Sequence, residues 1–319
     1  MWEKLAKHWF LVALAISFAV GYFWAEAWSP LLEWQLLRGG IVFVVMWAMS
    51  ITLRNEAIRK SYARPLPSLL SIGISVLLVP LLCLPTIYWL PESLFGGLFI
   101  AAIVPCTLAS ASVWTRRAGG DGSVAMMTTV VTNLACVVVA PIGIWLVLST
   151  HAEIDVVGQV MKLSIIVVLP LLLAQSMRRM GAADWADRNR GRLSGLGQAG
   201  MLVMVAIGAA TCGVTDTSSS IEVTPWLIAM LIFVSAAGLH TVTLFLGIFL
   251  SRCMGFDRGK QIAVAISGSQ KTLMVGLQMA IDCGVSVVPM IVYHLYQLVF
   301  DTVVVDHWKE ASDVGDISD

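Results

Sequence analysis

The sequence predicts an all-α integral membrane protein with ten transmembrane helices. Only 13% of its 319 residues are charged and 58% are hydrophobic, with a mean hydropathy of +0.85, whereas soluble proteins carry about 25% charged residues. The apolar runs approach the roughly 20 residues that span a bilayer, and the connections between them leave no room for a soluble domain. The lipid bilayer is therefore the expected surrounding, and nothing suggests a nucleic-acid partner.

Ten apolar segments are long enough to be considered as membrane spans. In chain order they are Trp9–Ala25, Leu36–Leu53, Ser68–Leu90, Leu94–Arg116, Ser123–Leu148, Val156–Met177, Leu196–Val214, Trp226–Leu250, Gln261–Ile281 and Val285–Val305.

The basic residues predict the orientation. If both termini are cytoplasmic, 17 of the 20 Lys and Arg residues lie on the cytoplasmic side, and only Arg38, Lys162 and Lys271 remain. Cytoplasmic loops of membrane proteins carry such an excess. We expect a multi-pass protein of the cell inner (plasma) membrane with both termini cytoplasmic. The sequence carries no indication of the oligomeric state.

The sequence lacks the patterns of enzymes and metal sites. Its six cysteines form no CxxC pair and lie mostly in apolar segments, where cysteine behaves as a small apolar residue. There is no HExxH, GxSxG or phosphate-binding loop, and no pair of intramembrane aspartates. We expect no enzymatic activity, no metal and no cofactor, apart from Na⁺ or H⁺ as a coupling ion.

Two breaks fall at the centres of spans four and nine. Ten spans divide into two halves of five, and an odd number makes the second half enter the membrane in the opposite direction, as in transporters built from inverted repeats. Pro105-Cys106-Thr107 lies at the centre of span four and Gly268–Lys271 at the centre of span nine, with Pro105 and Gly268 as the expected breaking residues. The alternatives are a simple kink at Pro105 and close helix packing at Gly268.

Lys271 is the most informative residue. It follows Ser267-Gly268-Ser269-Gln270 inside an otherwise apolar span. A lysine at the centre of a membrane helix costs about 2.5–3.5 kcal/mol on insertion scales. Such a residue, beside broken backbone, is found where protein or a watery cavity surrounds it. This predicts a transport site.

Polar residues near the two breaks are candidates for binding a substrate or an ion. They are Thr107, Ser110 and Ser112 after the first break, Thr129 and Asn133 in span five, and Ser267, Ser269, Gln270, Lys271 and Thr272 in span nine. The residues of span five share one helical face; alternatively, their side chains bond to their own helix.

Span ten carries two ionisable residues. His294 and Asp301 are seven residues apart and roughly aligned, so they either relay protons or fix span ten to its neighbours. His240 of span eight is expected to be a packed polar residue.

With these residues in place, the sequence resembles the bile acid:sodium symporter superfamily, most closely its SBF-like branch. The resemblance rests on ten spans, the break at Pro105 and the run from Gly268 to Thr272. It implies two groups of helices, with spans four and nine crossing at their unwound centres. A panel would comprise residues 1–66 (helices 1–2) and 151–222 (helices 6–7), a core residues 67–150 (helices 3–5) and 223–305 (helices 8–10), and 306–319 would form a cytoplasmic tail.

The resemblance also implies two sodium sites behind the crossing, and several of their ligands are replaced here. The family's glutamate falls on Ile266 and the following asparagine on Lys271, while its glutamine is retained as Gln270. The glutamine of span three falls on Ser75 and the asparagine after the first break on Ser112. An ammonium group without the carboxylate repels sodium, so we expect Lys271 to occupy the place of a cation.

The expected function is secondary transport of a small or amphipathic organic anion by alternating access, with sodium coupling doubtful because of these replacements. One alternative is a cation/proton exchanger, for which Asp301 is the candidate carboxylate. The other is a membrane sensor or an intramembrane enzyme.

Overall fold

The protein is helical throughout the part that the structure describes. The computed structural model describes residues 9–53, 65–108, 110–148, 155–215 and 225–315, and these contain no β-strand. Six helical segments in these ranges are long and apolar enough to cross a membrane, or seven if one bent pair of helices is counted as a span. The prediction of an all-α membrane protein is confirmed.

Six of the ten predicted segments correspond to continuous helical spans. Three of these spans are each a single α-helix: α10 (Gly122–Leu148), α15 (Pro225–Cys253) and α18 (Val288–Gly315). α14 (Arg190–Thr215) follows a span assembled from α11 (Val156–Leu163), η3 (Ser164–Val168), α12 (Leu169–Met177), η4 (Arg178–Ala182) and α13 (Ala183–Arg188). The sixth is assembled from α6 (Leu66–Gly73), η1 (Ile74–Leu78), α7 (Val79–Cys83) and η2 (Leu84–Tyr88).

The other four predicted segments are short or broken. α2 (Trp9–Phe23) turns by 91° into α3 (Ala25–Glu33), where the sequence predicted no second helix. α4 (Gln35–Ser50) has 16 residues. Spans four and nine are each divided, into α8 (Glu92–Ile103) and α9 (Ser110–Arg117), and into α16 (Arg258–Ser269) and α17 (Leu273–Asp282).

The last helix is longer than predicted. We expected span ten to end at Val305, but α18 continues to Gly315 and so extends into the segment predicted as a tail. The guanidinium carbon of Arg258 lies 5.0 Å from the centre of the Trp308 ring in this extension. This cation–π contact favours continuation of the helix beyond the apolar segment.

Proline creates a π-helical turn in two of the spans. In η1 the amide of Val79 donates to the carbonyl of Ile74, five residues earlier, and Pro80 follows. Proline lacks an N–H and its ring clashes with the carbonyl four residues before it, so a wider turn relieves the clash. The carbonyl of Ser75 is then left without the helical donor that Val79 would supply. The same arrangement recurs in η3, before Pro170.

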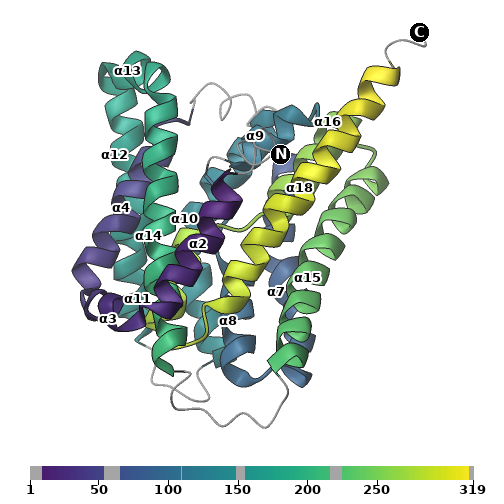
Figure 1. Ribbon diagram of the computed structural model, residues 1–319. Helices are drawn as coiled ribbons and strands as arrows, with labels where there is room; N and C mark the ends of the chain where they lie inside the picture. The colour runs from purple at the N-terminus through teal and green to yellow at the C-terminus, as the bar shows by residue number, and fades with distance from the viewer. Residues whose placement is uncertain (1–8, 54–64, 109, 149–154, 216–224, 316–319) are drawn as a thin grey trace.

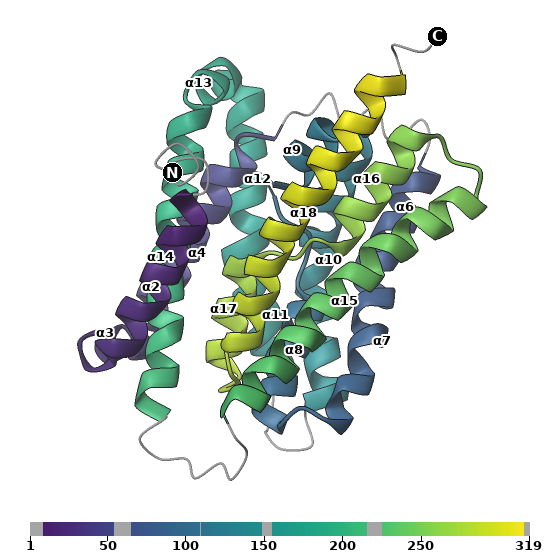
Figure 2. The same cartoon turned by 45° about the vertical axis from the view of Figure 1, so that its right-hand side comes forward.

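The helices form two groups in space. α14 packs against α2, α3 and α4, and α4 packs against α12. In the other group α15 packs against α16 and α18, and α16 packs against α6 and α10. Figures 1 and 2 show α2, α4, α12 and α14 together on one side of the molecule, with α15 and α18 on the other.

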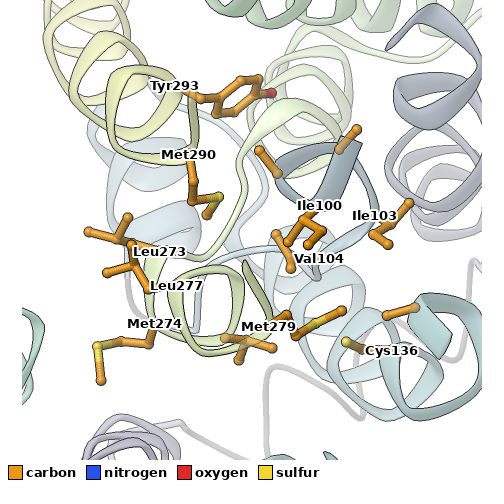
Figure 3. Packing of buried hydrophobic residues seen from close by; sticks show 14 of the residues in the cluster. Ile100, Ile103, Val104, Cys136, Leu273, Met274, Leu277, Met279, Met290 and Tyr293 are labelled. Carbon is orange, nitrogen blue, oxygen red and sulfur yellow. The ribbon is translucent and has the colours of Figure 1, made fainter. Parts of the chain in front are cut away.

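Apolar side chains cover both the outside and the interior, as expected where lipid replaces water. Large side chains such as Leu36, Leu146 and Phe233 are exposed. The interior cluster joins residues of α8, α17 and α18, and Figure 3 shows Ile100 and Val104 near the methionines and leucines of α17. The breaks in α8–α9 and α16–α17 therefore lie inside a packed core.

Several basic segments lie at one end of the molecule. α9, whose last turn holds Arg116 and Arg117, lies at the same end as α13 and the start of α16 in Figure 1. Six of the residues used to predict the orientation, at positions 4, 7, 54, 59, 60 and 64, fall outside the described ranges.

Candidate functional site

The first break separates α8 from α9 at the predicted proline. α8 ends at Ile103, and Val104 is extended, with φ −66° and ψ 157°. A residue before proline disfavours the helical conformation, and proline itself has no N–H to continue the ladder. The chain regains helix at Ser110. The prediction of a break at Pro105 is confirmed.

The second break overlaps the predicted stretch Gly268–Lys271 and comprises residues 270–272. Gly268 is part of α16, and the extended residues are Gln270 (φ −71°, ψ 139°) and Thr272 (φ −80°, ψ 130°). Gly268 instead permits a close approach, since a Cβ atom there would lie 3.0 Å from the Ile74 side chain. Within the predicted stretch, Gly268 itself remains helical, and it has the role in close helix packing that the sequence analysis gave as the alternative.

The two breaks bind each other and a polar face of α10. The amide of Thr272 donates to the carbonyl of Pro105 over 2.9 Å. α10 supplies three further hydrogen bonds to the first break. Thr132 Oγ1 accepts from the amide of Cys106 (3.2 Å), and Asn133 Nδ2 donates to the carbonyl of Cys106 (3.0 Å). Thr129 Oγ1 donates to the carbonyl of Thr107 (3.2 Å). α10 thus satisfies the backbone groups that the break leaves without helical partners.

Gln297 of α18 holds the second break. Its Oε1 accepts from the amide of Lys271 and its Nε2 donates to the carbonyl of the same residue, each over 3.0 Å. Both residues are fully buried. One side-chain amide therefore replaces the two backbone hydrogen bonds that Lys271 would make in a continuous helix.

The Lys271 ammonium lies in a cage of oxygens between the two breaks. Its Nζ donates to the Ser75 carbonyl (2.6 Å), to Ser75 Oγ (3.1 Å) and to the Val104 carbonyl (3.1 Å). Among the described residues, no carboxylate forms an ion pair with it. One of these carbonyls is freed by the π-helical turn before Pro80 and the other ends α8. Carbonyl and hydroxyl oxygens of this kind also bind metal cations, so the ammonium stands where a cation would find ligands.

Gln270 belongs to a second polar network. Its Oε1 accepts from Thr107 Oγ1 (2.8 Å) and from Ser110 Oγ (3.1 Å), and its Nε2 donates to Asp301 Oδ2 (2.6 Å). Asp301 Oδ1 lies 2.9 Å from His240 Nε2. Gln270, Asp301 and His240 are all fully buried. His240, expected to be merely packed, is thus a partner of Asp301.

His294 and Asp301 do not contact each other. His294 Nδ1 lies 2.9 Å from Gln297 Nε2, whereas Asp301 belongs to the network of Gln270 and His240. Both residues connect α18 to the second break, which agrees with the structural alternative of the sequence analysis. No described hydrogen bond joins the two side chains directly, as a proton relay between them would require.

A cavity of about 320 Å³ lies beside the breaks. Its polar lining comes from Thr107, Ser110 and Thr272 next to the breaks, and from His294, Ser194 and Gln198. Its apolar lining comes from both groups of helices and includes Met46 and Met49 of α4 and Leu298 of α18. Ligand sites combine such apolar walls with a few convergent polar groups.

The remaining predicted residues occupy different positions. Ser267 and Ser269 donate to carbonyls of their own helix, at Ala263 and Ala265, and do not line the cavity. Ser112 is buried in α9. The carbonyls of Val104 and Ser75, which accept from Lys271, were not predicted as parts of the site. Pro80, five residues after Ser75, could have indicated that the Ser75 carbonyl lacks a helical donor.

Comparison with known proteins identifies the family. The protein is 24% identical to "Putative symporter YfeH" of Escherichia coli (strain K12), over 74% of this chain and 73% of that protein. It is 21% identical to "Sodium/bile acid cotransporter 7-A" of Xenopus laevis over 95% of this chain and 92% of that protein. It is 25% identical to the chloroplastic "Probable sodium/metabolite cotransporter BASS4" of Arabidopsis thaliana, over 81% of this chain and 63% of that protein.

The match at the level of the family covers nearly the whole chain, since the family model aligns with residues 8–310. It agrees with the resemblance noted in the sequence and with the expectation of a multi-pass membrane transporter that is not an enzyme. The chain belongs to the SBF-like CPA transporter family.

Proposed function

We propose that this protein is a secondary transporter that carries a small organic anion across the inner membrane by alternating access, without sodium. The observation that carries the proposal is the position of Lys271, whose ammonium is bound by two backbone carbonyls and a hydroxyl where the two breaks meet. An ammonium fixed there supplies the positive charge that a coupling sodium would bring, and repels a second cation.

The helix grouping supports a panel and a core that move relative to each other. In this proposal residues 1–66 and 151–222 form the panel and residues 67–150 and 223–305 form the core. Each of the two inverted five-helix halves contributes two helices to the panel and three to the core, and both termini are cytoplasmic. In support, α2, α4, α12 and α14 pack together, while α15 packs against α16 and α18. The 320 Å³ cavity is lined from both groups, as a site exposed by their relative motion requires.

The chemistry of the cavity favours an anion. Its polar lining consists of hydroxyl, amide and imidazole groups that can donate hydrogen bonds, and no carboxylate is among the described lining residues. α9 begins at the cavity wall with Ser110, so the positive end of its dipole faces the same space. A volume of about 320 Å³ is at the lower end for ligand sites, which span about 300–1,000 Å³, and this favours a small substrate.

The exchanger alternative has less support. The carboxylate it needs, Asp301, does not line the cavity, and its two oxygens bind His240 and Gln270. A solute that reaches the cavity therefore meets Thr107 and Ser110 before it meets a carboxylate.

The proposal predicts uptake of an unmodified organic anion. Carboxylates and sulfonates that raise the melting temperature of the purified protein would be offered, radiolabelled, to sealed proteoliposomes. We expect saturable uptake of at least one of them, recovered chemically unchanged, and none in liposomes without protein. Conversion of the anion, or stabilisation by ligands with no uptake of any of them, would support the enzyme or sensor alternatives instead.

A further inference from the structure

Three charged residues meet at the end of the molecule where α17 ends. Asp282, the last residue of α17, accepts from Arg38 of α4 over 3.2 Å and from Lys162 of α11 over 2.5 Å. The side chains of Asp282 and Arg38 are 7% and 3% exposed. Arg38 and Lys162 are two of the three basic residues that the orientation analysis leaves outside the cytoplasmic side. The proposed transport mechanism has not used this cluster, which we term the outer triad.

Two residues of the outer triad, Asp282 and Arg38, do not stabilise the helices that carry them. A carboxylate at the C-terminal end of α17 opposes the helix dipole, and so does a guanidinium in the first turn of α4. These two charges are unfavourable for their own helices and are compensated by each other, whereas Lys162, in the last turn of α11, is favourably placed for its helix. The triad therefore serves the contact between helices.

The triad is also incompletely satisfied. Nε and Nη1 of Arg38 are buried without a hydrogen-bond partner, and so is Oε1 of Gln278, whose Nε2 binds Asp282. A buried donor without a partner costs free energy, which offsets part of the attraction. The triad therefore stabilises the contact between the helices less than a fully hydrogen-bonded cluster would.

The residues of the triad belong to different groups of helices. Asp282 is followed by a turn that is fixed to α8, because the amide of Ser286 donates to the carbonyl and hydroxyl of Ser93. Arg38 lies on α4, which packs against α12 and α14. The other described ion pairs, such as Arg178 with Asp187, join residues of the same group. The outer triad is therefore the described ionic link between panel and core.

A second cavity lies beside the triad. It measures about 710 Å³, and Lys162 and Asp282 are in its wall. The 320 Å³ cavity is lined by Thr272 and Met274, at the opposite end of α17. The triad and the packed length of α17 thus separate the two cavities.

We propose that Asp282, held by Arg38 and Lys162, is the positioning residue of an outer gate that keeps the core closed against the panel and must release in each transport cycle. This inference rests on the proposed alternating access. When the gate opens, Asp282 leaves Arg38 and Lys162, and α17 separates from α14.

Leu277 offers a probe for this separation. It is fully buried on α17, between Asp282 and Met274, and faces Gly208 of α14. A cysteine at this position reacts with a membrane-impermeant maleimide from the outer side only when α17 leaves α14. We would introduce Leu277→Cys alone and with Asp282→Asn, reconstitute each into sealed vesicles of known orientation, and follow labelling at each cysteine by mass spectrometry.

We expect Asp282→Asn to raise the outer labelling rate at position 277 on the order of tenfold, within the range of typical coupling between two conformations. Asp282→Glu retains the charge and should keep the rate near that of the parent. Asp187→Asn, which breaks the Arg178 pair within one group, is the matched control and should leave the rate unchanged.

The buried native residues Cys83 and Cys136 report unfolding in the same sample. If Asp282→Asn leaves labelling at position 277 unchanged, or raises it together with labelling of Cys83 and Cys136, the gate is refuted. Labelling requires no substrate. A specific response at position 277 with no uptake of any anion would therefore uphold the gate and reject the proposed substrate class.

Discussion

Lys271→Ala is expected to reduce anion uptake to the level of empty liposomes while leaving the protein in the membrane. The substitution removes the only described donor to the Ser75 and Val104 carbonyls from outside their own helices. Each carbonyl that stays buried and unpaired costs about 1–3 kcal/mol. The two breaks then lose the charge that holds α8 and η1 around the second break.

Lys271→Met separates the effect of charge from that of volume, because methionine fills most of the same space. We expect uptake by the Lys271→Met variant to be nearly as low as uptake by the Lys271→Ala variant. Lys260→Ala, which removes an ammonium paired with Asp257 at the start of α16, is the matched control and should transport normally. Unchanged uptake kinetics in Lys271→Ala would exclude Lys271 from the transport site.

Gln297→Met is expected to lower both the melting temperature and the uptake. Both backbone groups of Lys271 depend on this side chain, and methionine leaves them buried without partners. At about 1–3 kcal/mol for each group, the loss is about 2–6 kcal/mol, a large part of the 5–15 kcal/mol that stabilises a typical protein. Thermal unfolding in detergent measures the first effect and proteoliposome uptake the second.

The matched control is Gln159→Met, at a partly exposed position of α11. It should leave the melting temperature unchanged. If Gln297→Met unfolds at the parent temperature, the extended conformation of Lys271 does not depend on α18, and the description of the second break is wrong.

The broken helices could be predicted from the sequence because their causes are local. Pro105 lacks an N–H and its ring clashes with the preceding turn, and both effects favour the end of α8 at this point. The second break has no proline. The sequence predicted it at Gly268–Lys271 from the run of polar residues there; the structure keeps Gly268 helical, packed closely against Ile74, and begins the break at Gln270.

The partners of Lys271 and Asp301 could not be predicted, since they come from distant parts of the chain. The burial of Lys271 followed from its apolar neighbours, but the Ser75 carbonyl is 196 residues away and is free only because of the turn before Pro80. His240 meets Asp301 across 61 residues. The bend at Trp24 was also missed, because residues 25–33 carry no proline or glycine at the turn itself.

The most direct test of the central claim is binding of radioactive sodium to the purified protein, measured over a range of sodium concentrations. Uptake of the transported anion into proteoliposomes is measured beside it, once in sodium medium and once in choline medium. If the Lys271 ammonium fills the place of a cation, no saturable sodium binding appears and uptake of the anion is equal in the two media. Saturable sodium binding together with strong stimulation of uptake by sodium would contradict the account.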